Sequence, residues 1–304
     1  MTPDRARILV TGGSGFVGRH LVPRLVDAGA QVTVLTRSPA RAAGVLPGVD
    51  LVSDPAEAVR REPVAIVNLA GAGIADRPWT EGRRRELLTS RVDYTERLRE
   101  AFAAAPPRVL VSASAVGYYG VSEEKRFVEG DPPGAGFAAD LCVRWEAAAR
   151  SFEALGTRVA IARIGLVLGP GGLLGRLRLP FSLGLGGPIG DGRQWMSWVQ
   201  LEDVVRMLQR LLEDDAFSGP CNVTAPNPVR NAEFTRALGS VLRRPAVLPV
   251  PAPVLRLALG QMAEELLLSG AAVLPERAEA AGFTFVHARV ESALAAALGR
   301  EVRG

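Results

Sequence analysis

The stretch that decides the fold is Thr11-Gly12-Gly13-Ser14-Gly15-Phe16-Val17-Gly18. It directly follows the apolar run 7–10 and directly opens a segment with helical spacing, in which Leu21 and Leu25 follow Val17 on one face. Glycines placed in this way between a strand and a helix allow backbone amides to approach a pyrophosphate at the helix N-terminus. The loop predicts a dinucleotide site with cofactor contacts from Gly12, Ser14, Gly15, Phe16, Val17 and Gly18. The alternative is a glycine turn without a ligand.

Short apolar runs alternate with helix-length segments through the first half of the chain. These runs are 7–10, 31–36, 49–52, 64–69, 108–112 and 158–163. Near-continuous branched apolar strands indicate a parallel sheet that is covered by helices on both faces. Right-handed crossovers between such strands give a doubly wound α/β sheet of the Rossmann type.

The pattern changes after residue 168. Residues 169–192 are dense in glycine around Leu, Pro and Phe, which predicts a shaped loop over a cleft. Asp203 is expected to cap a helix over 204–212. We therefore divide the chain into a nucleotide-binding Rossmann domain, 1–168 with 198–225, and a smaller C-terminal lobe on the substrate side, 169–197 with 226–304.

Composition places the chain among ordinary globular proteins, since 48% of its 304 residues are hydrophobic and 22% are charged. No signal-peptide core opens it and no run reaches the roughly 18 apolar residues of a membrane span, so we expect a cytoplasmic protein without membrane contact. The net charge is +4, but the basic residues are spread along the chain, which argues against a nucleic-acid partner. Two cysteines and two histidines are too few for a convincing metal site.

The end of the second strand selects between the two nicotinamide cofactors. An acidic residue there binds the ribose hydroxyls of NAD, whereas a basic residue accommodates the extra phosphate of NADP. This chain has Thr36 followed by Arg37, with Arg41 one turn later. We therefore expect NADP(H) to be favoured over NAD(H). The alternative is that Arg37 is a solvated arginine at a strand end, in a chain rich in arginine.

The glycine loop and the segment Asn68-Leu69-Ala70-Gly71 resemble the extended short-chain dehydrogenase/reductase superfamily. Nearly the whole chain, with its short C-terminal domain, resembles the atypical epimerase-family branch of that superfamily. The further matching stretches are 90–91, 117–120, 145–149, 163–169, 180–198, 225–229 and 242–245. The resemblance implies cofactor contacts from Arg37, Leu69, Ala70, Gly71, Glu86, Arg91 and Leu166. Without it, Arg91 is as readily explained by a surface ion pair with Glu86 or Glu96.

The acid–base pair that the resemblance implies is missing. Hydride transfer in the superfamily uses a tyrosine and a lysine four residues on, whose charge lowers the pKa of the tyrosine. The only lysine here is Lys125, and Val121 stands four residues before it. If Glu146 is aligned with the glutamate that follows the motif in extended relatives, the tyrosine and lysine positions hold Ala138 and Cys142.

Two residues remain as candidates for catalysis. Ser114 matches the superfamily serine and is expected to bind a substrate oxygen, while Tyr118 is the candidate for a substitute acid. The alternative for Tyr118 and Tyr119 is packing at a strand end, with their hydroxyls in water. Cys142 is expected to be a buried helix residue rather than a nucleophile.

The sequence therefore predicts an NADP-dependent oxidoreductase or epimerase-like enzyme acting on a small carbonyl or hydroxyl compound. The competing hypothesis, favoured by the missing tyrosine and lysine, is a catalytically silent NADP(H)-binding sensor or scaffold. Because superfamily relatives often dimerise through helices, the resemblance also implies a homodimer as an expected assembly.

Overall fold

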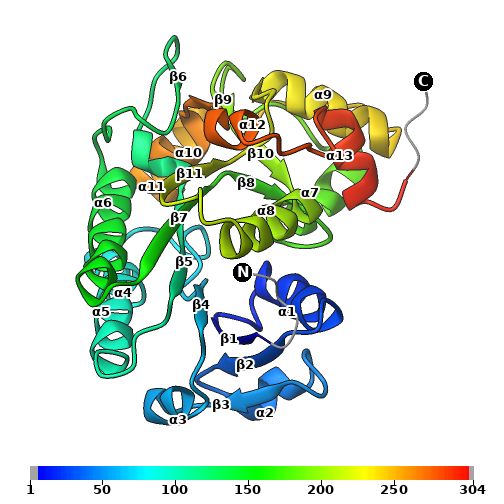
Figure 1. Cartoon of the computed structure of the whole chain (residues 1–304). Coiled ribbons are helices and arrows are strands. Elements are labelled where there is room, and N and C mark those ends of the chain that lie inside the picture. Colours follow the sequence, from blue (N-terminus) through cyan, green and yellow to red (C-terminus); the bar gives the residue numbers. More distant parts are fainter. Residues whose placement is uncertain (1–5, 301–304) are drawn as a thin grey trace.

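The computed structural model of the chain describes residues 6–300 (Figure 1). At its centre is a seven-stranded parallel sheet with the strand order β11-β7-β5-β4-β1-β2-β3. Its strands are β1 (Arg7–Thr11), β2 (Gln31–Leu35), β3 (Asp50–Val52), β4 (Ala65–Asn68), β5 (Val109–Ala115), β7 (Arg158–Ile164) and β11 (Gly219–Val223). The predicted doubly wound α/β sheet is confirmed, with strands at each of the predicted runs.

Helices cover both faces of this sheet. Successive side chains along each strand point to opposite faces, so these apolar strands present an apolar surface on each side that the helices bury. Ile8 and Val10 pack with α1 and α8 in one core, whereas Leu9 packs with α3, α5 and α6 in the other. The helices between the strands are α1 (Gly18–Asp27), α2 (Pro39–Ala43), α3 (Pro55–Arg60), α4 (Glu81–Thr89), α5 (Val92–Ala101), α6 (Phe137–Arg150) and α8 (Leu201–Glu213).

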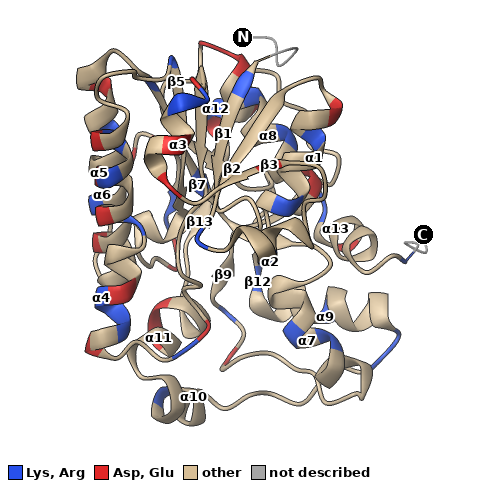
Figure 2. Cartoon of the chain, turned by 90° about the horizontal axis from the view of Figure 1, so that it is seen from below, with Lys and Arg blue, Asp and Glu red and all other residues tan. Residues whose placement is uncertain are grey.

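Four of the remaining helices, α7, α9, α10 and α11, lie together at one end of the molecule in Figure 2, whereas α12 lies at the other end of that view. The helices are η1 (Val116–Tyr119), η2 (Ser151–Leu155), α7 (Gly172–Ser182), α9 (Asn231–Leu242), α10 (Ala252–Leu259), α11 (Gln261–Ala263), η3 (Glu264–Leu268), α12 (Glu276–Ala280) and α13 (Val290–Ala297). Three short strand pairs are β8 (Leu166–Leu168) with β10 (Trp198–Gln200), β9 (Trp195–Met196) with β12 (Val229–Arg230), and β6 (Arg126–Phe127) with β13 (Ala272–Val273). The boundary drawn between the two lobes stays an interpretation.

Two local predictions were wrong. The segment 169–192 is not one loop, because α7 forms within it and buries Leu174 and Phe181 at helical spacing. Asp203 does not cap α8, since the side chain of Gln200 accepts the backbone N–H of Glu202 in the first turn of that helix. Asp203 lies fully buried inside α8 instead.

The carboxylate of Asp203 has a long-range role that no local pattern encodes. It accepts the backbone N–H groups of Val286 and His287 at 3.0 and 3.1 Å, and it pairs with Arg206 at 2.7 Å. Asp203 thereby ties the segment before α13 to the sheet-covering helix α8.

Charge and hydropathy are distributed without one dominant patch on the faces shown. Blue and red residues alternate along α4, α5 and α6 in Figure 2. None of the helices within residues 6–300 is long and apolar enough to cross a lipid bilayer. The cytoplasmic location stays a prediction.

Candidate functional site

The glycine loop packs tightly at the carboxyl end of β1. Gly12 has a φ of +69°, and a Cβ atom on it would lie 2.6 Å from the carbonyl oxygen of Leu69. A Cβ atom on Gly18 would collide with the carbonyl oxygen of Gly12. Both positions therefore require glycine, because the loop closes on itself and on the segment after β4.

The loop leaves backbone donors free where α1 begins. Gly15 donates to the carbonyl oxygen of Gly12 at 2.9 Å, but no group within residues 6–300 accepts a hydrogen bond from the amides of Ser14, Phe16 or Val17. Ser14 and Gly15 are exposed. Free amides at the positive end of a helix bind phosphate groups, so this loop fits the pyrophosphate of a dinucleotide.

Buried side chains hold the segment after β4 beside the loop. The Thr11 hydroxyl donates to the side-chain oxygen of Asn68 at 2.7 Å, and the Asn68 amide donates to Thr95 at 2.9 Å. These contacts tie β1, β4 and α5 together. They place Leu69 and Ala70 against Gly12, which brings the two predicted cofactor-binding segments into contact.

Arg37 and Glu86 are brought to the same side of the site. Thr36 is half-buried after β2, and Arg37 next to it is exposed. Glu86 on α4 accepts from Arg83 at 2.7 Å, and this bond is the main cause that holds the pKa of Glu86 below its ordinary value. The nearby charge of Arg37 lowers that pKa further, which shows that Arg37 lies within electrostatic reach of Glu86.

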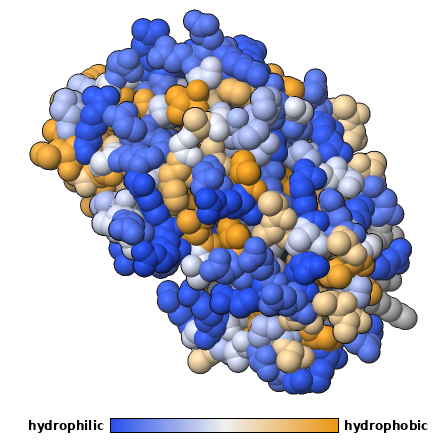
Figure 3. Space-filling view, turned by 90° about the vertical axis from the view of Figure 1, so that its left-hand side faces the viewer, coloured by the Kyte–Doolittle hydropathy of each residue, from blue (hydrophilic) through white to orange (hydrophobic). Residues whose placement is uncertain are grey.

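The segment between β8 and α7 lies over the phosphate loop. A Cβ atom on Gly169 or Gly172 would lie 3.0 or 3.1 Å from the ring of Phe16, which is half-buried. Leu166 begins β8 and donates its backbone N–H to the carbonyl oxygen of Ser197 at 2.8 Å. In Figure 3 a notch on the left-hand edge separates the larger upper mass from the smaller lower one, so this side of the molecule is hollowed.

Ser114 is held by a buried charge pair that sequence reasoning missed. Its hydroxyl donates to the carboxylate of Glu146 at 2.7 Å, and Ser114 is only 3% exposed. Arg163 donates to both oxygens of that carboxylate, each at 2.8 Å. The signal for this pair was an arginine inside the otherwise apolar run that forms β7.

The two tyrosines after β5 have different environments. Tyr119 is buried and donates to Asn222 at 2.7 Å, and burial raises its pKa to about 12. Tyr118 is half-buried, and its ring centre lies 3.4 Å from the guanidinium carbon of Arg163. No residue within 6–300 forms a hydrogen bond with its hydroxyl, so of these two tyrosines Tyr118 is the one whose hydroxyl is unpaired.

Ala138 and Cys142 occupy one face of α6, turned toward the end of β5. The Cβ of Ala138 lies 3.3 Å from where a Cβ of Gly117 would be, and the sulfur of Cys142 lies 3.7 Å from the carbonyl oxygen of Ala115. Cys142 is buried, as expected, and burial raises its pKa to about 11. The two positions assigned to the missing pair therefore face the strand that carries Ser114.

Arg91 is buried between α4 and α5, with 9% of its surface exposed. Its guanidinium donates to the carbonyl oxygen of Ala72 at 2.9 Å and lies over the ring of Trp145. Within residues 6–300 no carboxylate pairs with it, so the alternative of a surface ion pair with Glu86 or Glu96 is wrong. Arg91 instead reaches into the interior from the helix junction.

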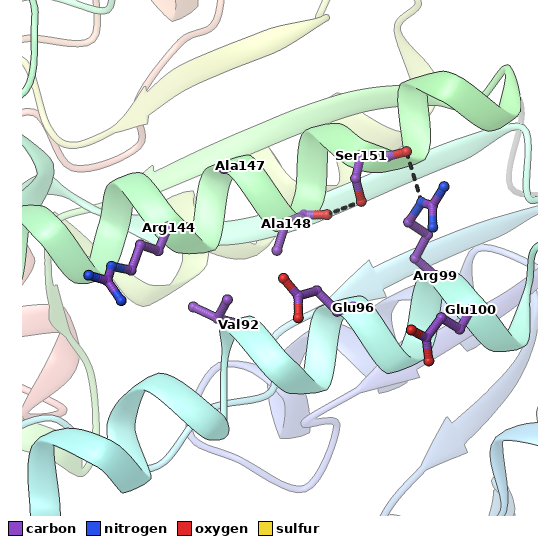
Figure 4. Close-up of a pocket in the computed structure, with 8 residues that line it drawn as sticks. All are labelled: Val92, Glu96, Arg99, Glu100, Arg144, Ala147, Ala148 and Ser151. Carbon is purple, nitrogen blue, oxygen red and sulfur yellow. Dashed lines mark hydrogen bonds between the residues drawn. The ribbon is translucent and has the colours of Figure 1, made fainter.

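A separate groove lies between α5 and α6, and Figure 4 shows its lining. Arg99 on α5 donates to the carbonyl oxygen of Ser151 at 3.1 Å across it. None of the residues that line it is a predicted cofactor or catalytic residue. The homodimer stays a prediction, since only one chain is described.

These features define a class of protein. A parallel sheet carries a glycine loop at the carboxyl end of β1, with free amides at the start of α1 and a basic residue after β2. This is the arrangement of a dinucleotide-binding protein with a Rossmann fold.

Comparison with known proteins identifies the family. Residues 8–223 match the NAD dependent epimerase/dehydratase family, and residues 250–297 match a domain of unknown function, DUF1731. The chain belongs to the NAD dependent epimerase/dehydratase family, and its resemblance to the epimerase-family branch of the extended short-chain dehydrogenases is confirmed.

Relatives of similar length match nearly the whole chain. Epimerase family protein Mb2239 of Mycobacterium bovis is 42% identical over 297 residues, which are 97% of this chain and 98% of that protein. Human epimerase family protein SDR39U1, crystallised with NADPH, is 35% identical with a TM-score of 0.86 and covers 96% of this chain and 99% of its own. The structure of UDP-glucose 4-epimerase of Thermus thermophilus in complex with NAD is 23% identical with a TM-score of 0.78, and the match covers 95% of this chain and 96% of that one. At this identity the likeness shows only that the two proteins share a fold.

Proposed function

We propose that this chain is an NADP(H)-dependent oxidoreductase or epimerase-like enzyme that acts on a small carbonyl or hydroxyl compound. The observation that carries the proposal is the phosphate loop with free amides beside Arg37, a basic residue directly after β2. The human relative crystallised with NADPH supports the same choice of cofactor.

The chain offers one set of contacts for each part of the nucleotide. The amides of Ser14, Phe16 and Val17 would hold the pyrophosphate, and Arg37 would hold the additional phosphate of the ribose. The backbone of 69–71 would line the opposite side. When bound, the nicotinamide cofactor supplies or accepts a hydride.

Ser114 and Tyr118 would contact the substrate. Because the Ser114 proton is donated to Glu146, the Ser114 oxygen is left with lone pairs that accept a hydrogen bond from a substrate hydroxyl. Polarising a carbonyl oxygen would require the hydroxyl to turn away from Glu146. The arrangement therefore favours a hydroxyl substrate, with Tyr118 exchanging the proton.

Arg37→Asp is expected to weaken NADPH binding by about 10–100-fold while changing NADH affinity little, because one charge-assisted phosphate contact is worth about 1.5–3 kcal/mol. Fluorescence titration with both nucleotides measures this. Arg60→Asp makes the same charge change in the last turn of α3, at a residue outside the predicted cofactor contacts, and serves as the control. Equal weakening of NADPH and NADH by Arg37→Asp would refute the assignment of Arg37 to the phosphate.

Ser114→Ala is expected to abolish turnover of carbonyl and hydroxyl compounds while NADPH affinity stays within about twofold, since the hydroxyl faces substrate rather than phosphate. The measurement is NADPH oxidation, or NADP⁺ reduction, across a panel of such compounds. Ser112→Ala, on the same strand and face, is the control. Loss of both turnover and NADPH binding in Ser114→Ala would indicate a structural role.

A silent NADP(H)-binding sensor is the second candidate. It is favoured by Ala138 and Cys142 at the positions of the missing pair, and by the Ser114 hydroxyl already bound to Glu146. Tight NADPH binding without turnover across the whole panel is the result expected of such a protein.

A further inference from the structure

We propose that one edge of the molecule, formed by α10 and by the ends of α7 and α9 with the loops that follow them, docks on an anionic lipid surface. This docking goes beyond the proposed function, because residues 171–190 and 234–263, which form the edge, contain none of the predicted cofactor or catalytic residues. A peripheral contact needs no spanning helix. The sequence-based expectation of no membrane contact, which rested on the lack of a spanning run, therefore does not bear on it.

Helix α10 is apolar but buries none of its residues. Seven of its eight residues are Ala, Pro, Val or Leu, and Arg256 is the only charged one. Leu255 and Leu259 are half-buried, so the helix rests on the molecule with one side, whereas Val254 is exposed and Leu257 is 92% exposed. Figure 2 shows α10 at the bottom edge of the molecule. Because a surface helix normally turns polar residues outward, the aliphatic outer side of α10 indicates that something covers it.

The loops after α7 and α9 extend the apolar surface of α10. Leu248 and Val250 donate their backbone N–H groups to the carbonyl oxygens of Gly186 and Pro188, at 3.1 and 2.9 Å. The loop that leads into α10 therefore lies beside the loop that follows α7. Seven of the twelve large hydrophobic residues that are exposed within residues 6–300 belong to these segments, and we call them the apolar edge: Leu179, Leu183, Leu185, Val247, Leu248, Val254 and Leu257. Exposed hydrophobic residues are normally scattered singly, so their gathering here marks an interaction surface.

The charge around the apolar edge has one sign. Residues 171–190 and 234–263 contain six arginines and no aspartate or glutamate. Arg178, Arg243 and Arg244 are exposed, and no carboxylate among the described residues pairs with any of them. Cations that flank an aliphatic surface attract acidic phospholipid headgroups, while their apolar stems lie along the surface itself. The partner that this edge fits is therefore anionic outside and apolar beneath, as a bilayer with acidic lipids is.

A second copy of the chain matches the edge poorly. In a two-fold contact the same surface would face itself, which brings the unpaired arginines of both copies together without a carboxylate between them. Protein interfaces also depend on aromatic residues that fill pockets in the partner, and the apolar edge consists of leucine and valine only. A lipid surface requires no pockets, because acyl chains adapt to any apolar shape.

The test is co-sedimentation of the whole chain with vesicles of phosphatidylcholine and phosphatidylglycerol in equal parts, or of phosphatidylcholine alone. The wild type is expected to bind the mixed vesicles and to bind phosphatidylcholine alone at least about 10-fold more weakly, since three unpaired arginines lose their attraction. Raising the ionic strength should weaken binding to the mixed vesicles.

Two pairs of substitutions separate the apolar and the charged parts of the contact. Val254→Ser/Leu257→Ser is expected to weaken binding to the mixed vesicles by about 10-fold or more, because it removes aliphatic surface from the outer side of α10. Val45→Ser/Val286→Ser changes two exposed valines elsewhere and is the control. Should Val254→Ser/Leu257→Ser lower the unfolding temperature, Leu179→Ser/Leu183→Ser at the end of α7 decides.

The charged part is tested by Arg178→Gln/Arg243→Gln, which should weaken binding to the mixed vesicles by about 10–30-fold. Arg60→Gln/Arg97→Gln removes the same charge from exposed positions on α3 and α5 and should leave that binding unchanged. NADPH titration of every variant should match the wild type, so a failure of docking and a failure of the proposed function are seen separately.

Three results would overturn the docking. One is a wild-type protein that stays in the supernatant with the mixed vesicles. Another is equal binding by the wild type and by a folded variant that lacks apolar residues of the edge. The third is a dimer in analytical ultracentrifugation that Val254→Ser/Leu257→Ser dissociates, without binding to vesicles, which would identify the apolar edge as an interface between copies of the chain.

Discussion

Urea denaturation of Glu146→Leu is expected to show a free energy of unfolding lower by about 3–5 kcal/mol, because the change leaves a buried arginine without its partner. Arg163 and Glu146 are 2% and 5% exposed at the side chain and are joined at 2.8 Å. The same carboxylate holds the hydroxyl of Ser114, so its loss also frees the predicted substrate-binding group.

The loss of stability expected in Glu146→Leu comes from the buried charge of Arg163 that is left unpaired, rather than from a large stabilisation by the intact ion pair. The double variant Arg163→Met/Glu146→Leu should therefore recover most of the stability, since two apolar side chains replace two charges of similar volume. Asp140→Leu breaks the exposed pair with Arg144 on the same helix and should cost about 1 kcal/mol or less. Similar costs for Glu146→Leu and Asp140→Leu would contradict the reasoning.

Gly12→Ala is expected to weaken NADPH binding by about 100-fold or more, equivalent to about 2.7 kcal/mol. The new methyl group would lie 2.6 Å from the carbonyl oxygen of Leu69 and occupy a residue with a φ of +69°. To relieve this contact the loop must open, which moves the free amides away from the phosphates. Nucleotide titration and thermal unfolding of the same sample measure both effects.

Gly48→Ala separates the cost of backbone strain from the cost of the collision. Gly48 also has a positive φ, +78°, but a Cβ atom there meets nothing within 4 Å. It should destabilise the protein by about 1–2 kcal/mol and leave NADPH affinity unchanged. Equal NADPH affinities for Gly12→Ala and Gly48→Ala would show that the close packing of Gly12 does not matter for binding.

The sheet could be predicted because its strands are local apolar runs. β11 was not predicted as a strand, since it begins with Gly219 and Pro220, which are unfavourable in strands, and only its last three residues are buried. Pairing with β7 supplies the stabilisation that local propensity lacks. The helix α7 was hidden in the same way by its glycines and by Pro180.

The site was predictable where a local pattern carries the chemistry. The phosphate loop and the segment 68–71 have such patterns, and the two lie in contact. The alignment on Glu146 also placed Ala138 and Cys142 on the helix face turned toward β5. The burial of Arg91 and the bond between Ser114 and Glu146 depend on how α4, α5 and α6 pack, which no spacing along the chain records.

The pairing of β6 with β13 has a consequence for how the molecule is made. During synthesis, β6 can pair with β13 only after residues near 272 have left the ribosome. At ordinary rates of synthesis this is on the order of ten seconds after residues near 126 have emerged. Glu129, just after β6, likewise accepts the backbone N–H groups of Asn222 and Arg277 only when both have arrived. The boundary between the two matched family segments is therefore not a boundary between folding units, and a chain cut near residue 250 would leave β6 without its neighbour.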